Sequence, residues 1–229
     1  MYTRRIDFTL FAIDSFNKFL NESYFLFPQI KESRKVYCAK DIIEKELGMY
    51  GKMGEVINLY SMYKETNEEK WKIIAENLLD EIIEQCDNHV PLDYGSGLCG
   101  IGVGIEWLIH NNYIEGDADN ILAEIDGKIL HAINARNITQ ASISHGILGI
   151  AYYIYNRLCY RKKVETSVTL ILKEYSIYLL DWMEEVLQDE EKEKDYKEFY
   201  FILILFHQLD IYNAKVIRLL ECCDNKIIG

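Results

Sequence analysis

Apolar side chains recur every three or four positions along most of the chain, which places them on one face of an α-helix. The first such segment covers residues 4–20 and the second covers residues 36–47, with a proline-containing loop at residues 21–33 between them. The chain has only two prolines, Pro28 and Pro91, and proline breaks the interior of a helix. The pattern therefore predicts an all-α fold with long helices.

Three Gly-x-x-Gly motifs divide the middle of the chain at a nearly constant interval. They begin at Gly51, Gly97 and Gly146, which lie 46 and 49 residues apart, and each precedes an apolar helical run. This interval fits two helices of about 15 to 20 residues with their loops. We therefore expect one helical hairpin per motif, with an inner helix that starts at the glycines and an outer helix with a polar face.

The segments between and after the motifs carry helical patterns of their own. Helices are predicted for residues 67–85, 117–135, 165–187, 199–209 and 214–222. Asn67 is expected to cap the first of these, and Asp117 and Asp119 lie where the dipole of the second favours negative charge. The charged run over residues 189–197 is interpreted as a solvated helix end or loop without a function.

Composition indicates a globular protein with an acidic surface. Hydrophobic residues make up 49% and charged residues 27%, and the 229 residues can bury one core, so residues 1–229 are treated as a single domain. Acidic residues outnumber basic ones by 37 to 25, which gives a net charge of -12. Because phosphate backbones attract the opposite sign, we expect no nucleic-acid partner, whereas a cationic or neutral peptide would be attracted.

Targeting and redox features favour the cytoplasm. Near the N-terminus Asp7 and Asp14 interrupt the apolar residues, unlike the continuous apolar core of a signal peptide. No run approaches the roughly 20 apolar residues of a membrane span. The six cysteines lie at wide, irregular spacings that suit neither a disulfide framework nor a Cys-x-x-Cys metal site. We therefore expect a protein of the reducing cytoplasm.

Paired glycines at the start of a helix can serve either close packing or ligand binding. Glycine lets one backbone approach another closely, and the same helix N-termini point N–H groups into the space that they surround. The glycines between Gly95 and Gly102 also resemble a dinucleotide-binding loop. We disfavour that function, because no strand precedes the loop and no βαβ alternation follows it.

Two polar residues stand beside the glycine motifs: Asp93, four residues before Gly97, and His145, immediately before Gly146. Both would lie near a common axis if the hairpins curl into a ring. A histidine that titrates near neutrality and a neighbouring carboxylate can act as acid and base. The alternative is that the two residues only cap their loops. The other histidines lack the spacing that places two metal ligands on one helical face.

The motifs around these two residues resemble those of the lanthionine synthetase C-like family. Asp93-x-x-x-Gly-Leu-x-Gly resembles that family's Asp-x-x-x-Gly-x-x-Gly turn, and Ser-His145-Gly-x-x-Gly resembles its Ser/Ala-His-Gly-x-x-Gly turn. With the motif at Gly51, the likeness covers residues 51–155. The resemblance implies helical hairpins that form part of an α/α toroid.

The resemblance also implies a zinc-dependent addition of a peptide cysteine thiol to a dehydroalanine or dehydrobutyrine, with Asp93 and His145 as catalytic residues that move protons. That family holds its zinc through a Trp-Cys-x-Gly turn and a Cys-His pair before a glycine. Neither motif occurs in this sequence, so no metal ligand or cofactor is assigned. Zinc is expected only where a missing part or a partner supplies ligands.

Three explanations of this difference stay open: a fragment without its metal-binding half, a half toroid completed by a second copy or a partner, and a shortened relative without cyclase chemistry. We expect a lanthionine synthetase C-like protein of peptide modification that binds a peptide rather than closing thioether rings alone. One alternative is a non-catalytic helical-repeat scaffold. A weaker one is an α/α toroid carbohydrate enzyme using Asp93 and Glu106, although Glu106 is expected to lie mid-helix.

Overall fold

A computed structural model describes residues 46–87, 89–161 and 165–228, and every regular element in these ranges is an α-helix. The all-α prediction is thus confirmed. Within the same ranges, no helix combines the length and the apolar character that crossing a membrane requires. The helices are α3 (Lys52–Thr66), α4 (Glu69–Gln85), α5 (Leu98–His110), α6 (Ala118–Ile121), α7 (Ala123–Ala135), α8 (Ile147–Cys159), α9 (Ser167–Gln188), α10 (Tyr196–Gln208) and α11 (Asn213–Ile228).

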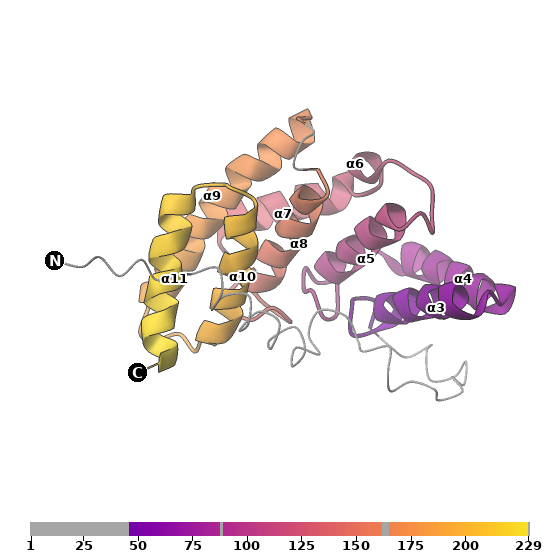
Figure 1. Cartoon of the computed structure of the whole chain (residues 1–229), viewed down its shortest axis with the longest axis horizontal. Coiled ribbons are helices and arrows are strands. Elements are labelled where there is room, and N and C mark those ends of the chain that lie inside the picture. Colours follow the sequence, from indigo (N-terminus) through magenta and orange to yellow (C-terminus); the bar gives the residue numbers. More distant parts are fainter. Residues whose placement is uncertain (1–45, 88, 162–164, 229) are drawn as a thin grey trace.

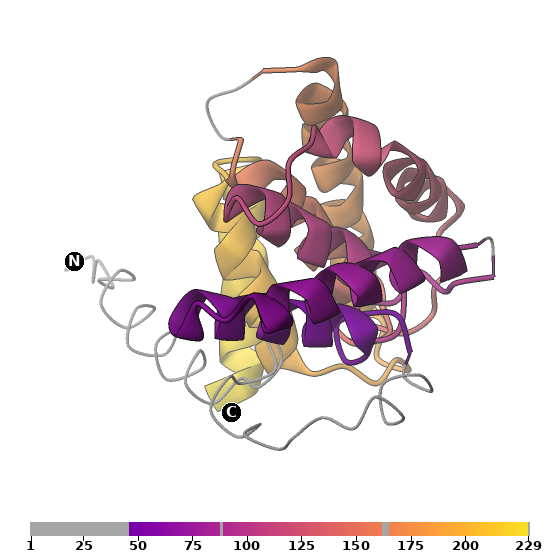
Figure 2. The same cartoon turned by 90° about the vertical axis from the view of Figure 1, so that its right-hand side faces the viewer.

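The helices pair into four consecutive hairpins, α3/α4, α5/α7, α8/α9 and α10/α11, with the short α6 in the second connection (Figure 1). The first helices of the hairpins form one layer, in which α5 packs against α3 and α8, and α8 packs against α10. In the second layer α9 packs against α7 and α11, while α4 covers α3. Viewed from the α3/α4 end, the later hairpins follow behind the first (Figure 2).

The first three hairpins open on turns that share one backbone design. We call residues 46–51, 91–97 and 140–146 the first, second and third glycine turns. Each ends at a glycine that is the N-cap of the inner helix: Gly51 for α3, Gly97 for α5 and Gly146 for α8. The prediction that inner helices start at these glycines is therefore confirmed.

The chain folds back on itself within each of these turns. The first helical N–H of α5 donates to the carbonyl oxygen of Pro91 at 2.8 Å, and that of α8 donates to the carbonyl oxygen of Gln140 at 3.1 Å. A Cβ atom added at Gly97 or Gly146 would fall onto these same two carbonyl groups. Only glycine therefore lets the turn close, and the reason is space rather than a positive φ.

Neighbouring glycine turns are also joined to one another by backbone hydrogen bonds. The N–H of Tyr50 donates to the carbonyl of Gly95 at 2.9 Å, and the N–H of Gly95 donates to the carbonyl of Ser144 at 2.9 Å. The second glycine of a motif permits this approach, because a Cβ atom on Gly100 would lie 2.5 Å from the nitrogen of Met49. The three turns therefore form one continuous row.

The helix ends differ from the sequence-based expectations at three places. Asn67 does not cap α4; it ends α3 in the left-handed conformation, with φ 55°, because a tight connection follows. The helix predicted over residues 117–135 is interrupted at Leu122, which separates α6 from α7. Asp117 is the N-cap of α6, and its side chain accepts the N–H of Asp119. Helix α10 begins at Tyr196, before its predicted start, and α11 extends from Asn213 to Ile228, beyond both of its predicted limits. The elements predicted before residue 46 lie outside the described residues.

The steric demand of the turns predicts opposite effects for two alanine substitutions. Gly97→Ala forces a Cβ atom against the Pro91 carbonyl, and we expect it to lower the free energy of unfolding by about 2 to 3 kcal/mol. Gly127→Ala is the matched control, because Gly127 is exposed within α7 and a Cβ atom there meets nothing within 4 Å. It should stabilise by about 0.5 to 1 kcal/mol. Urea unfolding measures both, and equal effects would contradict the close-approach explanation.

Candidate functional site

The second and third glycine turns bring Asp93 and His145 together. The Nδ1 atom of His145 lies 3.4 Å from Oδ2 of Asp93, although the residues are 52 positions apart in the sequence. The His145 side chain is 52% exposed and that of Asp93 29% exposed. A side-chain contact with this exposure stabilises a fold by less than about 1 kcal/mol. The contact between Asp93 and His145 therefore adds little to the stability of the fold, and both side chains are accessible to solvent.

Neither residue caps its helix through its side chain. The N-caps of α5 and α8 are the glycines, and neither makes a side-chain cap bond. The hydroxyl of Ser96 donates to Oδ2 of Asp93 at 3.1 Å, and the backbone N–H of His145 donates to the hydroxyl of Ser142 at 3.1 Å. These contacts brace the two loops and leave the imidazole ring outside the helix. The capping alternative therefore does not describe His145.

Tyr50 extends this polar surface onto the first glycine turn. The Ser144 hydroxyl donates to the phenol oxygen of Tyr50 at 3.4 Å. Partial burial raises the pKa of Tyr50, the hydrogen bond from Ser144 lowers it, and the negative charge of Glu198 raises it. The three glycine turns thus contribute one polar side chain each, Tyr50, Asp93 and His145, to the same polar surface.

A pocket of about 880 Å³ adjoins His145. Its walls are the third glycine turn, the loop after α9, the first turn of α10 and the end of α11. The side chains that carry charge here are Lys192, Lys194, Lys197, Lys226, Glu193, Asp195 and Glu198. The local charge is therefore mixed, so the net charge of -12 does not predict the field inside the pocket.

Three of the charged residues also build the pocket wall. The Lys194 ammonium donates to backbone carbonyls at the end of α9, among them those of Val186 at 3.0 Å and Leu187 at 3.2 Å. Asp195 caps α10. Glu198 accepts the N–H of Ile143 at 2.8 Å. Burial raises the pKa of Glu198, whereas the bond from Ile143 lowers it.

The described residues do not fit the zinc ion that the family resemblance implies. Among them, no three His, Cys, Asp or Glu side chains are grouped so that they could hold a metal. Cysteine binds zinc as a thiolate, and burial raises the pKa of Cys99 well above its usual value and that of Cys223 to about 12. We therefore derive no chemical step through a metal.

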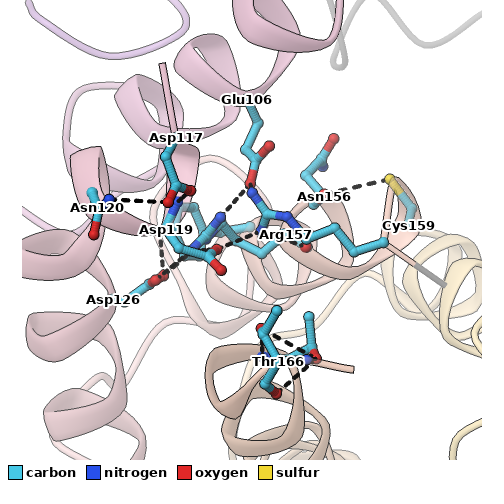
Figure 3. A network of polar contacts seen from close by, with 12 residues as sticks. Glu106, Asp117, Asp119, Asn120, Asp126, Asn156, Arg157, Cys159 and Thr166 are labelled. Atoms are coloured by element: carbon cyan, nitrogen blue, oxygen red, sulfur yellow. Dashed lines mark hydrogen bonds and ion pairs between the residues drawn. The ribbon is translucent and has the colours of Figure 1, made fainter. Parts of the chain in front are cut away.

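A second cluster of charged residues lies away from the pocket, around the buried Arg157 of α8 (Figure 3). Its guanidinium bonds both oxygens of Asp126 in α7, at 3.1 and 2.6 Å, and also binds Glu106 in α5 and Asp119 in α6. Burial alone would lower the pKa of Arg157, but the bonds to Asp126 raise it above the usual value. The cluster ties the second hairpin to α8.

Glu106 is fully engaged in this cluster. Its side chain is 5% exposed, and its Oε1 atom is bound by Arg157 and by Arg161, the latter at 2.9 Å. It lies within α5, as expected, and is held by cations rather than paired with Asp93 across a cleft. Glu106 is therefore not free to form with Asp93 the carboxylate pair that glycoside hydrolysis uses.

No protein-family model matches the chain, and no curated protein matches it significantly. The likeness to lanthionine synthetase C-like proteins therefore rests on the motifs around Asp93 and His145. The fold places those two motifs side by side, as expected from converging inner helices.

The charged run at 189–197 was not identified from the sequence as part of the candidate site. A signal was available, because Asp195 follows Gly146 by the same 49 residues that separate the second and third motifs.

Two arginine substitutions test whether the buried cluster holds the second hairpin to α8. Arg157→Met leaves Glu106 and Asp126 as buried carboxylates without their main cation, so we expect a loss of about 3 to 5 kcal/mol in the free energy of unfolding. Arg218→Met is the control, because Arg218 is 64% exposed and pairs with Glu184 at the surface. It should cost less than about 1 kcal/mol. Similar losses in urea unfolding would refute the structural role of the cluster.

Proposed function

We propose that this chain is a lanthionine synthetase C-like protein of peptide modification and that its hairpins form part of an α/α toroid. In this proposal the protein binds a peptide beside Asp93 and His145 and does not close thioether rings by itself. The observation that carries the proposal is the contact between Nδ1 of His145 and Oδ2 of Asp93 at the edge of the pocket.

The orientation of the imidazole supports a role toward a ligand. With Nδ1 turned to the carboxylate of Asp93, the ring presents Nε2 as its other polar atom. A carboxylate at Nδ1 favours the tautomer in which Nε2 accepts a proton. The ring could then accept a hydrogen bond from a peptide thiol or amide. Asp93, braced by Ser96, fixes the direction of that acceptor.

The pocket supports a peptide rather than a small anionic ligand. About 880 Å³ is within the range of ligand-binding clefts, and its walls carry both lysines and carboxylates. Such a surface can bind the alternating backbone donors and acceptors of a peptide together with side chains of either charge. Because the described residues offer no zinc site, the peptide thiol would keep its proton, and binding is proposed without ring closure.

Binding of a synthetic peptide tests this proposal. The probe is a fluorescein-labelled peptide with one cysteine and one dehydroalanine, followed by fluorescence polarisation. We expect the wild-type protein to bind it, and His145→Ala and Asp93→Asn each to weaken binding about tenfold, since each removes a directed polar contact. The free thiol of the peptide should persist during the incubation.

His131→Ala is the matched control, because His131 is exposed on the outer helix α7, away from the pocket. It should leave binding unchanged. All variants should unfold within about 0.5 kcal/mol of wild type, as expected for exposed positions. A large loss of stability in His145→Ala with unaltered binding would instead make the chain a packing scaffold, and absence of binding by wild type would also overturn the proposal.

A further inference from the structure

The fourth hairpin continues the repeat without its glycines. Asp195, the N-cap of α10, stands where Gly146 stands at α8, and Glu198 therefore occupies the position of the second glycine, Gly149. The sequence Asp195-Tyr-Lys-Glu198 thus replaces Gly-x-x-Gly. The substitution matters because the second glycine is the residue that touches the preceding turn.

At the second and third motifs, the second glycine lies close to the preceding turn, against its backbone at Gly100 and against a side chain at Gly149. A Cβ atom on Gly100 would lie 2.5 Å from the Met49 nitrogen, and one on Gly149 would lie 3.1 Å from the Cβ atom of Tyr94. At the fourth hairpin, the Glu198 side chain reaches the preceding turn, where Oε2 accepts the N–H of Ile143 at 2.8 Å. A carboxylate thus reaches the preceding turn where the second and third motifs have a glycine.

A glutamate in this position places a carboxylate side chain at the junction of the third and fourth hairpins, where a glycine has none. The pocket lies at this junction, between the third glycine turn and the start of α10. We propose that Glu198 is a positioning residue: it keeps the pocket open between the third and fourth hairpins and fixes the loop that carries His145. The part that concerns peptide affinity rests on the proposed function, whereas the part that concerns the loop does not.

The bond to Glu198 completes the support of the loop at residues 143–145. On one side the Ser144 carbonyl accepts the N–H of Gly95, which ties this loop to the second turn. On the other side Glu198 holds the Ile143 N–H, two residues before His145. Without the second bond, the loop would be tied to a neighbouring hairpin only on the side of the earlier glycine turns, and the imidazole would lose its fixed approach to Asp93.

Two substitutions of Glu198 separate hydrogen bonding from charge. Glu198→Gln keeps an oxygen that can accept the Ile143 N–H, whereas Glu198→Met has a similar length and offers only a weak acceptor. Hydrogen exchange of the Ile143 amide, measured by NMR on the whole protein without peptide, reports the bond directly. We expect exchange about tenfold faster in Glu198→Met and near wild type in Glu198→Gln.

The labelled peptide described above supplies the second measurement. Glu198→Met should bind it about tenfold more weakly, and Glu198→Gln should bind it as wild type does. Glu191→Met is the control, because Glu191 is an exposed carboxylate on the same loop that does not line the pocket, and it should change neither measurement. This comparison separates loss of the bond from loss of a negative charge near the pocket.

Three outcomes would overturn the inference. Unchanged exchange of the Ile143 amide in Glu198→Met would show that the bond does not hold the loop. The two variants could also lose peptide affinity equally while only Glu198→Met changes the exchange of the Ile143 amide. That result would assign Glu198 a direct contact with the peptide instead. Exchange that rises at every core amide would indicate global destabilisation. If wild type binds no peptide, the exchange measurement still decides the positioning role while the proposed function fails.

Discussion

Close approach of one backbone to another is the constraint on which this structure depends. At Gly97 and Gly146 the chain packs against its own carbonyl groups, and at Gly100 it packs against the first glycine turn. Each approach leaves no room for a Cβ atom, so the spacing of the inner helices follows from residues that lack one. Hydrogen bonds between successive turns then fix their order, and the loops before the helices come to lie in one row.

The site follows from this row. Asp93 and His145 lie on adjacent turns, and the backbone bond from Gly95 to Ser144 holds those turns together independently of any contact between the two side chains. The polar side chains on the glycine turns are therefore positioned by hydrogen bonds of the backbone. The fourth hairpin departs from the rule, since the Glu198 side chain spans the junction, and this is where the pocket lies.

The buried charges perform a different task at the other end of the same helices. Arg157 joins α5, α6, α7 and α8 through carboxylates that would be costly to bury alone. Glycines thus set the distance between α5 and α8 near their starts, and an ion cluster holds them further along. Directional bonds at this depth favour one arrangement of the hairpins over others that would bury similar apolar area.

Glycine spacing and apolar periodicity determined much of the fold from the sequence alone. Both are local properties, so the all-α class, the starts of α3, α5 and α8, and the proximity of Asp93 and His145 were predictable. Helix caps were less predictable from the sequence. Asn67 can cap either end of a helix, and the short connection between α3 and α4 makes it the C-cap of α3. The ion cluster of Arg157 and the role of Glu198 depend on residues 31 to 55 positions apart. Only the tertiary structure decided those, since packing chooses which distant side chains meet.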